Sequence, residues 1–141
     1  RHEDVAALGA AVVIGTEDLA AHGPYDVVLE LVGAASLPHA LGALATGARV
    51  AVIGVGSGAR VELDLRTLMG TRATVGGSML RSRSRAEKAG VAAALRAHVL
   101  PLLADGRLRV PVCDTYRLAE AAAAYDRFGA GGKLGKIVLV A

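Results

Sequence analysis

Residues 48–59 read ARVAVIGVGSGA, an apolar run that ends in a cluster of glycines. The apolar part predicts a buried β-strand over 48–54, and the glycines predict a turn directly after it. Gly54, Gly56 and Ala59 have the spacing G-x-G-x-x-A, which is typical of a turn that holds a dinucleotide pyrophosphate when a helix follows. The segment after the turn therefore decides what the turn does.

That segment does not have a helical pattern. Residues 59–65 read ARVELDL and alternate as extended chain does, and no acidic residue closes a second strand about twenty residues further on. A pyrophosphate site needs a helix N-terminus here, because its free N–H groups and its field hold the phosphates. We therefore interpret 54–58 as a tight turn at the carboxyl edge of a sheet, where it can contact a cofactor, and not as the pyrophosphate loop.

Further apolar runs on both sides of this stretch predict more strands, with helices between them. Strands are expected at 11–14, 25–32, 72–80, 110–118 and 136–141. Helices are expected at 3–8, 36–45, 84–104 and 118–128, with a helical or irregular link at 64–70. Nearly continuous apolar strands separated by helices are typical of a parallel sheet covered on both faces, which is a doubly wound α/β fold.

Local signals fix several of the expected helix ends. Ser36 is expected to cap the helix that follows it, with Pro38 in its first turn. Ser84 and Glu87 have the spacing of a capping box, and Pro101 is expected to kink or shorten the end of the same helix.

Composition and charge limit the possible partners. The chain has 141 residues, 53% of them hydrophobic and 21% charged, which is a globular composition. Its net charge of +3 is scattered, and no basic stripe interleaved with aromatic residues argues for nucleic acid. No run approaches the roughly 18 apolar residues that span a bilayer. We therefore expect neither nucleic acid nor a membrane as a partner.

The single cysteine bears on the cellular compartment of the protein, and the first residues bear on whether the chain was cut from a longer one. The single cysteine, Cys113, excludes an internal disulfide and a Cys-rich zinc site, and it favours a reducing, cytoplasmic compartment. The chain opens with RHED, without a leader and without an initiator Met. We expect it to be processed, trimmed or cut from a longer protein.

No catalytic acid or base can be assigned from the residues. The four histidines are scattered and none is paired with a Ser, Cys or carboxylate in a recognisable arrangement; they are His2, His22, His39 and His98. We expect ordinary surface or helix positions for all of them, and no metal site in this chain.

Four phrases together resemble the medium-chain dehydrogenase/reductases, most of all their zinc-free quinone oxidoreductase branch. The phrases are YDVVLELVG at 25–33, ALGALATGARVAVIGVGSG at 40–58, LMGTRATVGGSMLRSRS at 68–84 and LGKIVLV at 134–140. The resemblance implies a C-terminal portion of such an enzyme. Residues 1–80 would be the second half of a Rossmann-like cofactor-binding domain. Residues 81–141 would be a helix and a strand-helix-strand segment that returns to a catalytic domain.

The resemblance implies an NADPH-dependent oxidoreductase that transfers a hydride to a quinone or an enone-type acceptor. The alternatives in the same chemistry are an enoyl reductase module of a larger synthase and a zinc-dependent alcohol dehydrogenase. An alternative of another class is a non-catalytic α/β module for binding or dimerisation. We expect the 141-residue chain alone to be inactive, and the edge strand near 72–80 to pair across a two-fold axis in a homodimer.

The resemblance also places cofactor-binding residues along the chain. Arg1 falls where a basic residue faces the 2′-phosphate of NADPH, unless it is only a solvated terminal residue, and Thr16 resembles a position beside the adenosine end. The positions that resemble the lining of the nicotinamide and its ribose are Gly33, Gly54, Val55, Ser57 and Gly58. The strand end whose backbone would meet the carboxamide is Ser78, Met79 and Leu80. For the glycines, turns that need a positive φ are the competing explanation.

Overall fold

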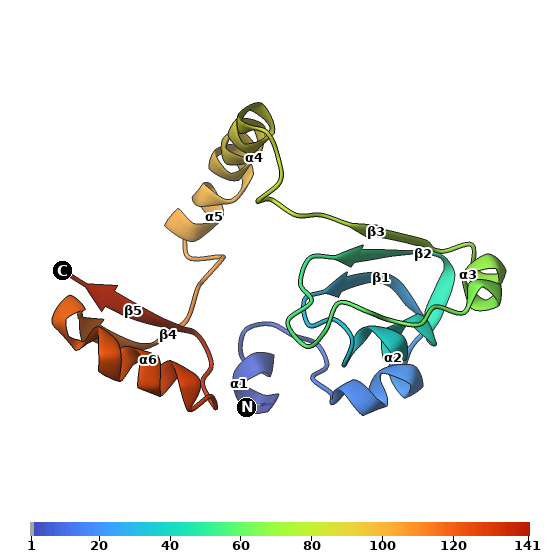
Figure 1. The fold of residues 1–141 in the computed structure, drawn as a ribbon, viewed down its shortest axis with the longest axis horizontal. Coiled ribbons are helices and arrows are strands. Elements are labelled where there is room, and N and C mark those ends of the chain that lie inside the picture. Colours follow the sequence, from blue (N-terminus) through green and yellow to red (C-terminus); the bar gives the residue numbers. More distant parts are fainter. Residues whose placement is uncertain (1) are drawn as a thin grey trace. The chain divides into compact units, whose positions relative to one another are not determined.

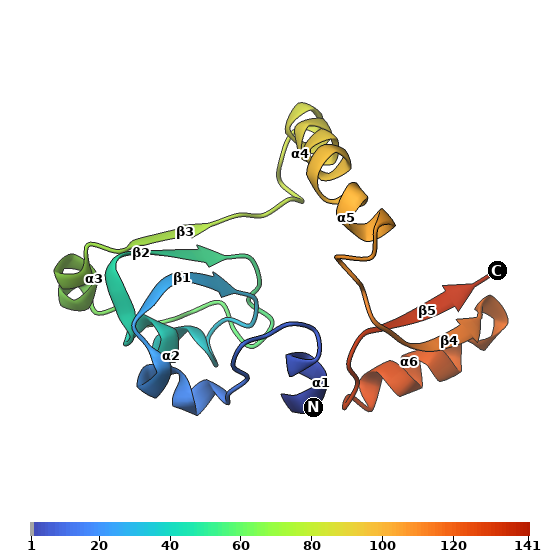
Figure 2. The ribbon, with the colours of Figure 1, turned by 180° about the vertical axis from the view of Figure 1, so that it is seen from behind.

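The computed structural model describes residues 2–141, which fold into two compact units (Figures 1 and 2). The sheet unit comprises residues 11–83, and the C-terminal unit comprises residues 84–141 together with the chain up to Ala10. The elements of the sheet unit are η1 (Thr16–His22), β1 (Tyr25–Glu30), α2 (Leu37–Leu41), β2 (Leu44–Val52), α3 (Leu65–Thr71) and β3 (Thr74–Gly77). Those of the C-terminal unit are α1 (His2–Ala6), α4 (Arg85–His98), α5 (Leu100–Ala104), β4 (Val112–Arg117), η2 (Leu118–Glu120), α6 (Ala121–Gly129) and β5 (Lys136–Val140).

The strands of the sheet unit run parallel in the order β1-β2-β3, so strands that follow one another in the sequence are neighbours (Figure 1). Parallel neighbours need crossover connections, and α2 and α3 lie in these crossovers. All three carboxyl ends therefore lie at the same edge of the sheet. The structure confirms the predicted α/β class with a parallel sheet of Rossmann type.

The core of the sheet unit lies between α2 and one face of the sheet. Leu37 and Leu41 of α2 pack with Leu44, Ala48 and Val50 of β2, and each of these residues is at most 8% exposed. Leucine, valine and alanine side chains fill this space between the helix and the sheet.

The segment between β2 and α3 is extended, as its alternating pattern predicts. Val61 and Leu63 pack against the core, whereas Arg60 and Glu62 are exposed. No helix begins at the glycine turn, and α3 starts only at Leu65. The structure therefore confirms that no helix follows the turn, and the interpretation that the turn does not hold a pyrophosphate stays a prediction.

The expected helix over 36–45 is much shorter in the structure. It ends at Leu41, because the carbonyl of Ala43 accepts a hydrogen bond of 2.8 Å from the backbone of Tyr25, and Leu44 pairs with Tyr25 in the sheet. Strand pairing thus takes over residues that the sequence assigns to a helix. β2 consequently begins four residues before the expected position and passes through Gly47, whose φ is +80°.

The expected strand over 11–14 does not form. These residues have no regular secondary structure, and β1 pairs only with β2 among the described strands. A strand is stable only when its N–H and C=O groups have ladder partners, and no described strand offers them to this segment. The short apolar run was therefore not sufficient to predict a strand.

The expected strand over 72–80 is reduced to β3, the four residues Thr74–Gly77. It lies at one edge of the sheet, and Arg72 before it ends α3 in the left-handed conformation. The residues after Gly77 leave the sheet at its carboxyl edge.

In the C-terminal unit, β4 and β5 form a parallel pair connected through α6. Asp114 of β4 and Arg127 of α6 form an ion pair of 3.0 Å in which both side chains are about one third exposed. Arg127 also donates to the carbonyl of Gly131 at 2.9 Å, so its guanidinium ties the strand, the helix and the loop after it.

The long helix predicted from Ser84 is present and is broken near its end. Ser84 accepts a hydrogen bond from the backbone of Glu87, and the Glu87 carboxylate accepts one from the backbone of Ser84, so the capping box is confirmed. The helix is interrupted at Val99, just before Pro101, and α5 continues for five residues. Within residues 2–141, no helix is long and apolar enough to cross a membrane.

Candidate cofactor-binding edge

Three loops follow the carboxyl ends of the parallel strands in the sheet unit. They are residues 31–36 after β1, residues 53–58, which form the turn after β2, and residues 78–83 after β3. We call this set of loops the carboxyl edge. In open parallel sheets, ligands gather outside the carboxyl ends of the strands, so this is the candidate site.

A buried carboxylate organises the first loop. Glu30, the last residue of β1, is 4% exposed, although it follows the apolar run of residues 27–29. Its Oε1 accepts hydrogen bonds from the backbone N–H groups of Val32 and Gly33 and from the hydroxyl of Ser36, the last two at 2.8 Å. The hydroxyl of Ser36 also lies 2.8 Å from Oε2. The carboxylate therefore holds the chain in a sharp bend after the strand.

These hydrogen bonds determine the charge state of Glu30. Burial alone would raise the pKa of this carboxyl, because it disfavours the charged form. The hydrogen bonds from Gly33, Val32 and Ser36 outweigh burial, since each of them stabilises the ionised form, and the net result is a pKa below the ordinary value of 4.5. Glu30 is therefore a buried anion at neutral pH.

Ser36 does not cap α2 as the sequence predicts. It has no capping hydrogen bond, because its hydroxyl donates to the Glu30 carboxylate instead. An ionised acceptor makes the stronger bond. Glu30 is the residue that sequence reasoning missed, and its signal was a charged residue at the end of the apolar run 27–29, three positions before Gly33.

Ser57 joins the first and second loops. Its hydroxyl donates to the carbonyl of Val32 at 2.8 Å and accepts from the backbone N–H of Ala35 at 3.0 Å, and its own N–H also donates to Val32. The backbone of Ala34 donates to Gly58 at 3.0 Å. The single donor of the Ser57 hydroxyl is thus used within the protein, and only a remaining lone pair could accept from a cofactor.

The glycines of the two loops allow their backbones to touch. Gly33 has a φ of +103°, and a Cβ there would lie 2.5 Å from the carbonyl oxygen of Gly58 and 2.8 Å from the Cα of Val55. A Cβ on Gly54 would clash with the carbonyl of Leu31. Both glycines are therefore required by the contact between the loops. Gly58, with a φ of +140°, is required by its backbone conformation.

The third loop joins the edge through the backbone of Ser78, which donates to Val52 at 3.1 Å. Its hydroxyl accepts from Arg83 at 2.8 Å. Met79 and Leu80 are 66% and 56% exposed. The structure thus brings Ser78, Met79 and Leu80 to the same edge of the sheet as the first two loops.

Two expected cofactor residues do not lie in these loops. Thr16 is the half-buried first residue of η1, which packs against α2. Arg1 lies outside the described residues. Their assignment to the adenosine end of the cofactor stays a prediction.

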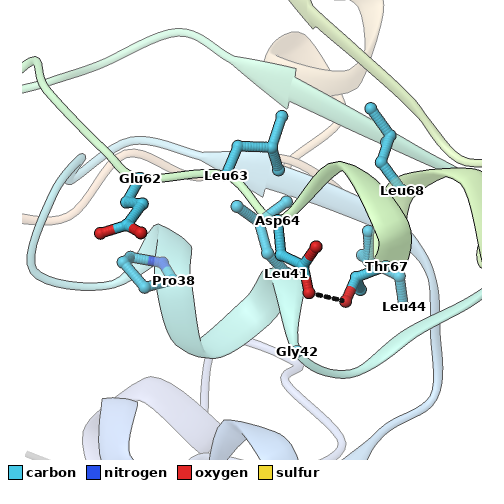
Figure 3. Close-up of a pocket in the computed structure, with 9 residues that line it drawn as sticks. All are labelled: Pro38, Leu41, Gly42, Leu44, Glu62, Leu63, Asp64, Thr67 and Leu68. Atoms are coloured by element: carbon cyan, nitrogen blue, oxygen red, sulfur yellow. Dashed lines mark hydrogen bonds between the residues drawn. The ribbon is translucent and has the colours of Figure 1, made fainter.

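A pocket of about 180 Å³ lies elsewhere in the sheet unit, between α2, the start of β2 and α3 (Figure 3). Its apolar wall includes Leu41, Leu44 and Leu68, and Glu62 stands at its rim. Asp64 caps α3 by accepting from Arg66 at 2.8 Å, and it accepts from the hydroxyl of Thr67 at 3.2 Å. Since this pocket adjoins the start of β2, it is not part of the carboxyl edge.

The described residues do not offer a zinc site. Among residues 2–141, no three His, Cys, Asp or Glu side chains come together so that they could hold a metal ion. We therefore derive no reaction step through zinc in this chain. A nicotinamide cofactor fits better, since the exposed Met79 and Leu80 and the glycine backbones of the first two loops meet at one edge.

Comparison with known families identifies the chain. A family model described as zinc-binding dehydrogenase matches residues 8–139. The chain therefore belongs to the zinc-binding dehydrogenase family, within the medium-chain dehydrogenase/reductases. Oxidoreductase chemistry is the common activity of this family and of its structural neighbours.

Solved structures support the same fold. A thermostable alcohol dehydrogenase from Pyrobaculum aerophilum is 28% identical with a TM-score of 0.76, and the match covers 99% of this chain and 39% of that one. A mycobacterial protein complexed with NADPH is 24% identical with a TM-score of 0.70, covering 94% of this chain and 44% of that one. A quinone oxidoreductase from Pseudomonas syringae is 24% identical with a TM-score of 0.66, covering 89% and 38%.

The chain is shorter than the solved structures that it matches. It spans about two fifths of the length of the solved structures that it matches. The comparison with curated proteins gave no match.

Proposed function

We propose that the natural protein containing this chain is an NADPH-dependent oxidoreductase that transfers a hydride to a quinone or an enone. The observation that carries this proposal is the meeting of three loops at the carboxyl edge of a parallel sheet, in a chain of the zinc-binding dehydrogenase family. The NADPH bound to the mycobacterial neighbour and the quinone oxidoreductase from Pseudomonas syringae support the cofactor and the acceptor.

The chain's own contribution to such a reaction is to position the cofactor. The hydride comes from the nicotinamide when NADPH is bound, and the protein supplies binding and orientation. We assign the nicotinamide and its ribose to the backbone around Gly33, Gly54, Val55, Ser57 and Gly58. The carboxamide is assigned to the backbone of residues 78–80.

The exposed apolar face of the sheet supports the proposal that further chain completes the enzyme. On the face of β1 away from α2, Val27 and Leu29 are 59% and 63% exposed. Parallel sheets are normally buried on both faces, so these side chains favour further chain packed on this face in the natural protein. We accordingly propose that the 141-residue chain alone does not turn over.

A zinc-dependent alcohol dehydrogenase is the second candidate, because the alcohol dehydrogenase from Pyrobaculum aerophilum matches at the higher identity of 28%. In that case, the metal ligands would lie in parts of the natural protein outside this chain. The metal content of the purified protein and its activity with alcohols separate the two candidates.

The preference for NADPH is tested at Arg1. A guanidinium binds a phosphate in a forked geometry, and NADH lacks the 2′-phosphate that NADPH carries. In the natural protein, Arg1→Ala is therefore expected to weaken the binding of NADPH by about tenfold, which corresponds to the loss of one charge-assisted hydrogen bond. The binding of NADH should be nearly unchanged. The dissociation constants can be measured by calorimetry. Equal weakening of both cofactors would remove Arg1 from the site.

For the assembly, we propose a homodimer formed through β3. This strand lies at an edge of its sheet, and all four of its residues are exposed. An unpaired edge offers N–H and C=O groups to a second copy. The solution mass of the natural protein tests this proposal, as a monomer would contradict it. We also propose a cytoplasmic location, which the single unpaired Cys113 supports.

A further inference from the structure

We infer that Glu30 is a positioning residue, whose buried carboxylate sets the shape of the loop that receives the nicotinamide end of the cofactor. The inference rests on the proposed function and deepens it. No cofactor contact is assigned to the Glu30 side chain itself, which acts through Val32, Gly33 and Ser36.

The first argument is the concentration of bonds on one buried group. Three donors from the loop converge on Oε1, and the hydroxyl of Ser36 is shared with Oε2. The donors are the N–H groups of Val32 and Gly33 and this hydroxyl. A carboxylate from the preceding strand, and not a helix cap, thus accepts three hydrogen bonds from this six-residue bend.

The second argument is that Glu30 connects two of the three loops. Its backbone carbonyl accepts from Ile53 at 2.8 Å and from Gly54 at 3.1 Å, at the start of the second loop. Its side chain meanwhile fixes Gly33, which touches the backbone of Val55 and Gly58. A change in the bend after β1 would therefore shift the place where the two loops meet.

The third argument is that stability alone does not favour a charge at this position. Burying a carboxylate is costly, and an apolar side chain of similar volume often gives equal or greater stability. Val28 on the same face of β1 packs with the core, so an apolar residue at position 30 would continue that packing. The carboxylate instead imposes a backbone shape, with Gly33 at a φ of +103°.

The test compares, in the natural protein, the binding of NADPH with the binding of a ligand that lacks the nicotinamide end. Glu30→Gln keeps the volume but replaces the anion by a neutral amide. The amide oxygen is a weaker acceptor for the N–H groups of Val32 and Gly33, and the NH₂ group takes the place of Oε2 beside the Ser36 hydroxyl. We expect this variant to weaken the binding of NADPH by about tenfold, as the loss of one charge-assisted hydrogen bond would. For adenosine 2′,5′-bisphosphate, which lacks the nicotinamide end, the dissociation constants of the variant and the wild type should agree within about twofold. A difference of that size is smaller than the loss of a single hydrogen bond would cause. Both dissociation constants can be measured by calorimetry.

Two further variants make the result decisive. Asp64→Asn is the matched control, because Asp64 also accepts from a backbone N–H and a hydroxyl, but it does so beside the other pocket. It should leave both ligands unchanged. Ser36→Ala removes one donor and leaves the carboxylate in place, so it should weaken NADPH selectively even if Glu30→Gln does not fold.

Each outcome has one meaning. Selective weakening of NADPH by Glu30→Gln or Ser36→Ala supports the inference. Equal weakening of both ligands, or unchanged NADPH binding, would overturn it and leave the proposed function standing if the wild type binds NADPH. A wild-type protein that binds neither ligand would overturn the proposed function and the inference with it.

Discussion

At the scale of single residues, Glu30 and Ser57 explain why the first two loops have one shape. Glu30 gathers the donors of its own loop, and Ser57 joins that loop to the next through Val32 and Ala35. Sequence patterns found the loops, since glycines after apolar runs predict turns at strand ends. They did not find the partners within the loops, because hydrogen bonds between residues 22 or 25 positions apart depend on tertiary structure.

The charge of Glu30 predicts a specific pH dependence. Because the folded-state pKa of Glu30 lies below its ordinary value of 4.5, the ionised carboxylate stabilises the folded loop above that pH. This contribution is lost as the pH falls through the folded-state pKa. Glu30→Gln should therefore lower the free energy of opening of the loop by about 2 kcal/mol at neutral pH and by much less in acid.

Amide hydrogen exchange at Val32 and Gly33 measures that free energy directly. Protection factors of wild type and Glu30→Gln should differ most at neutral pH and converge in acid, as the pH falls below 4.5 and through the lowered pKa of the wild-type carboxyl. A constant difference over this range would show that the charge of Glu30 does not hold the loop.

At the scale of elements, the sequence predicted the helix ends that depend on residues close by in the chain. The capping box of Ser84 and Glu87 and the break before Pro101 formed as expected, because each depends on neighbours within one turn of the helix. The ends of α2 and β2 were displaced, since the pairing of Leu44 with Tyr25 comes from another part of the chain. The strand expected over 11–14 failed for the same kind of reason, as it lacks a ladder partner among the described strands.

The capping box gives a prediction at this scale. Ser84→Ala removes the acceptor for the backbone N–H of Glu87, and it should destabilise the first turn of α4 by about 1 kcal/mol. Protection factors of the amides of residues 86–88 measure the effect. Ser82→Ala is the control, since the Ser82 hydroxyl donates to the carbonyl of Met79 before the helix begins. Equal changes in the two variants would show that the cap does not stabilise α4.

At the scale of the whole molecule, the fold class could be predicted from the order of apolar strands and helices, and family membership agrees with it. The division into a cofactor domain over 1–80 and a return segment over 81–141 stays a prediction. Apart from Arg1 and Thr16, the expected cofactor residues lie in the loops after the three strands, because parallel strands bring their carboxyl ends to one edge. Which residues there contact a cofactor also stays a prediction.

We propose, above all, that the natural protein uses NADPH to reduce a quinone. The most direct measurement follows NADPH absorbance in the purified natural protein with a simple quinone as acceptor, with the 141-residue chain assayed in parallel. We predict quinone-dependent oxidation of NADPH by the natural protein and none by the chain alone, because no helix begins at its glycine turn to hold the pyrophosphate. No oxidation of NADPH or NADH by the natural protein, with zinc-dependent oxidation of an alcohol in its place, would contradict it.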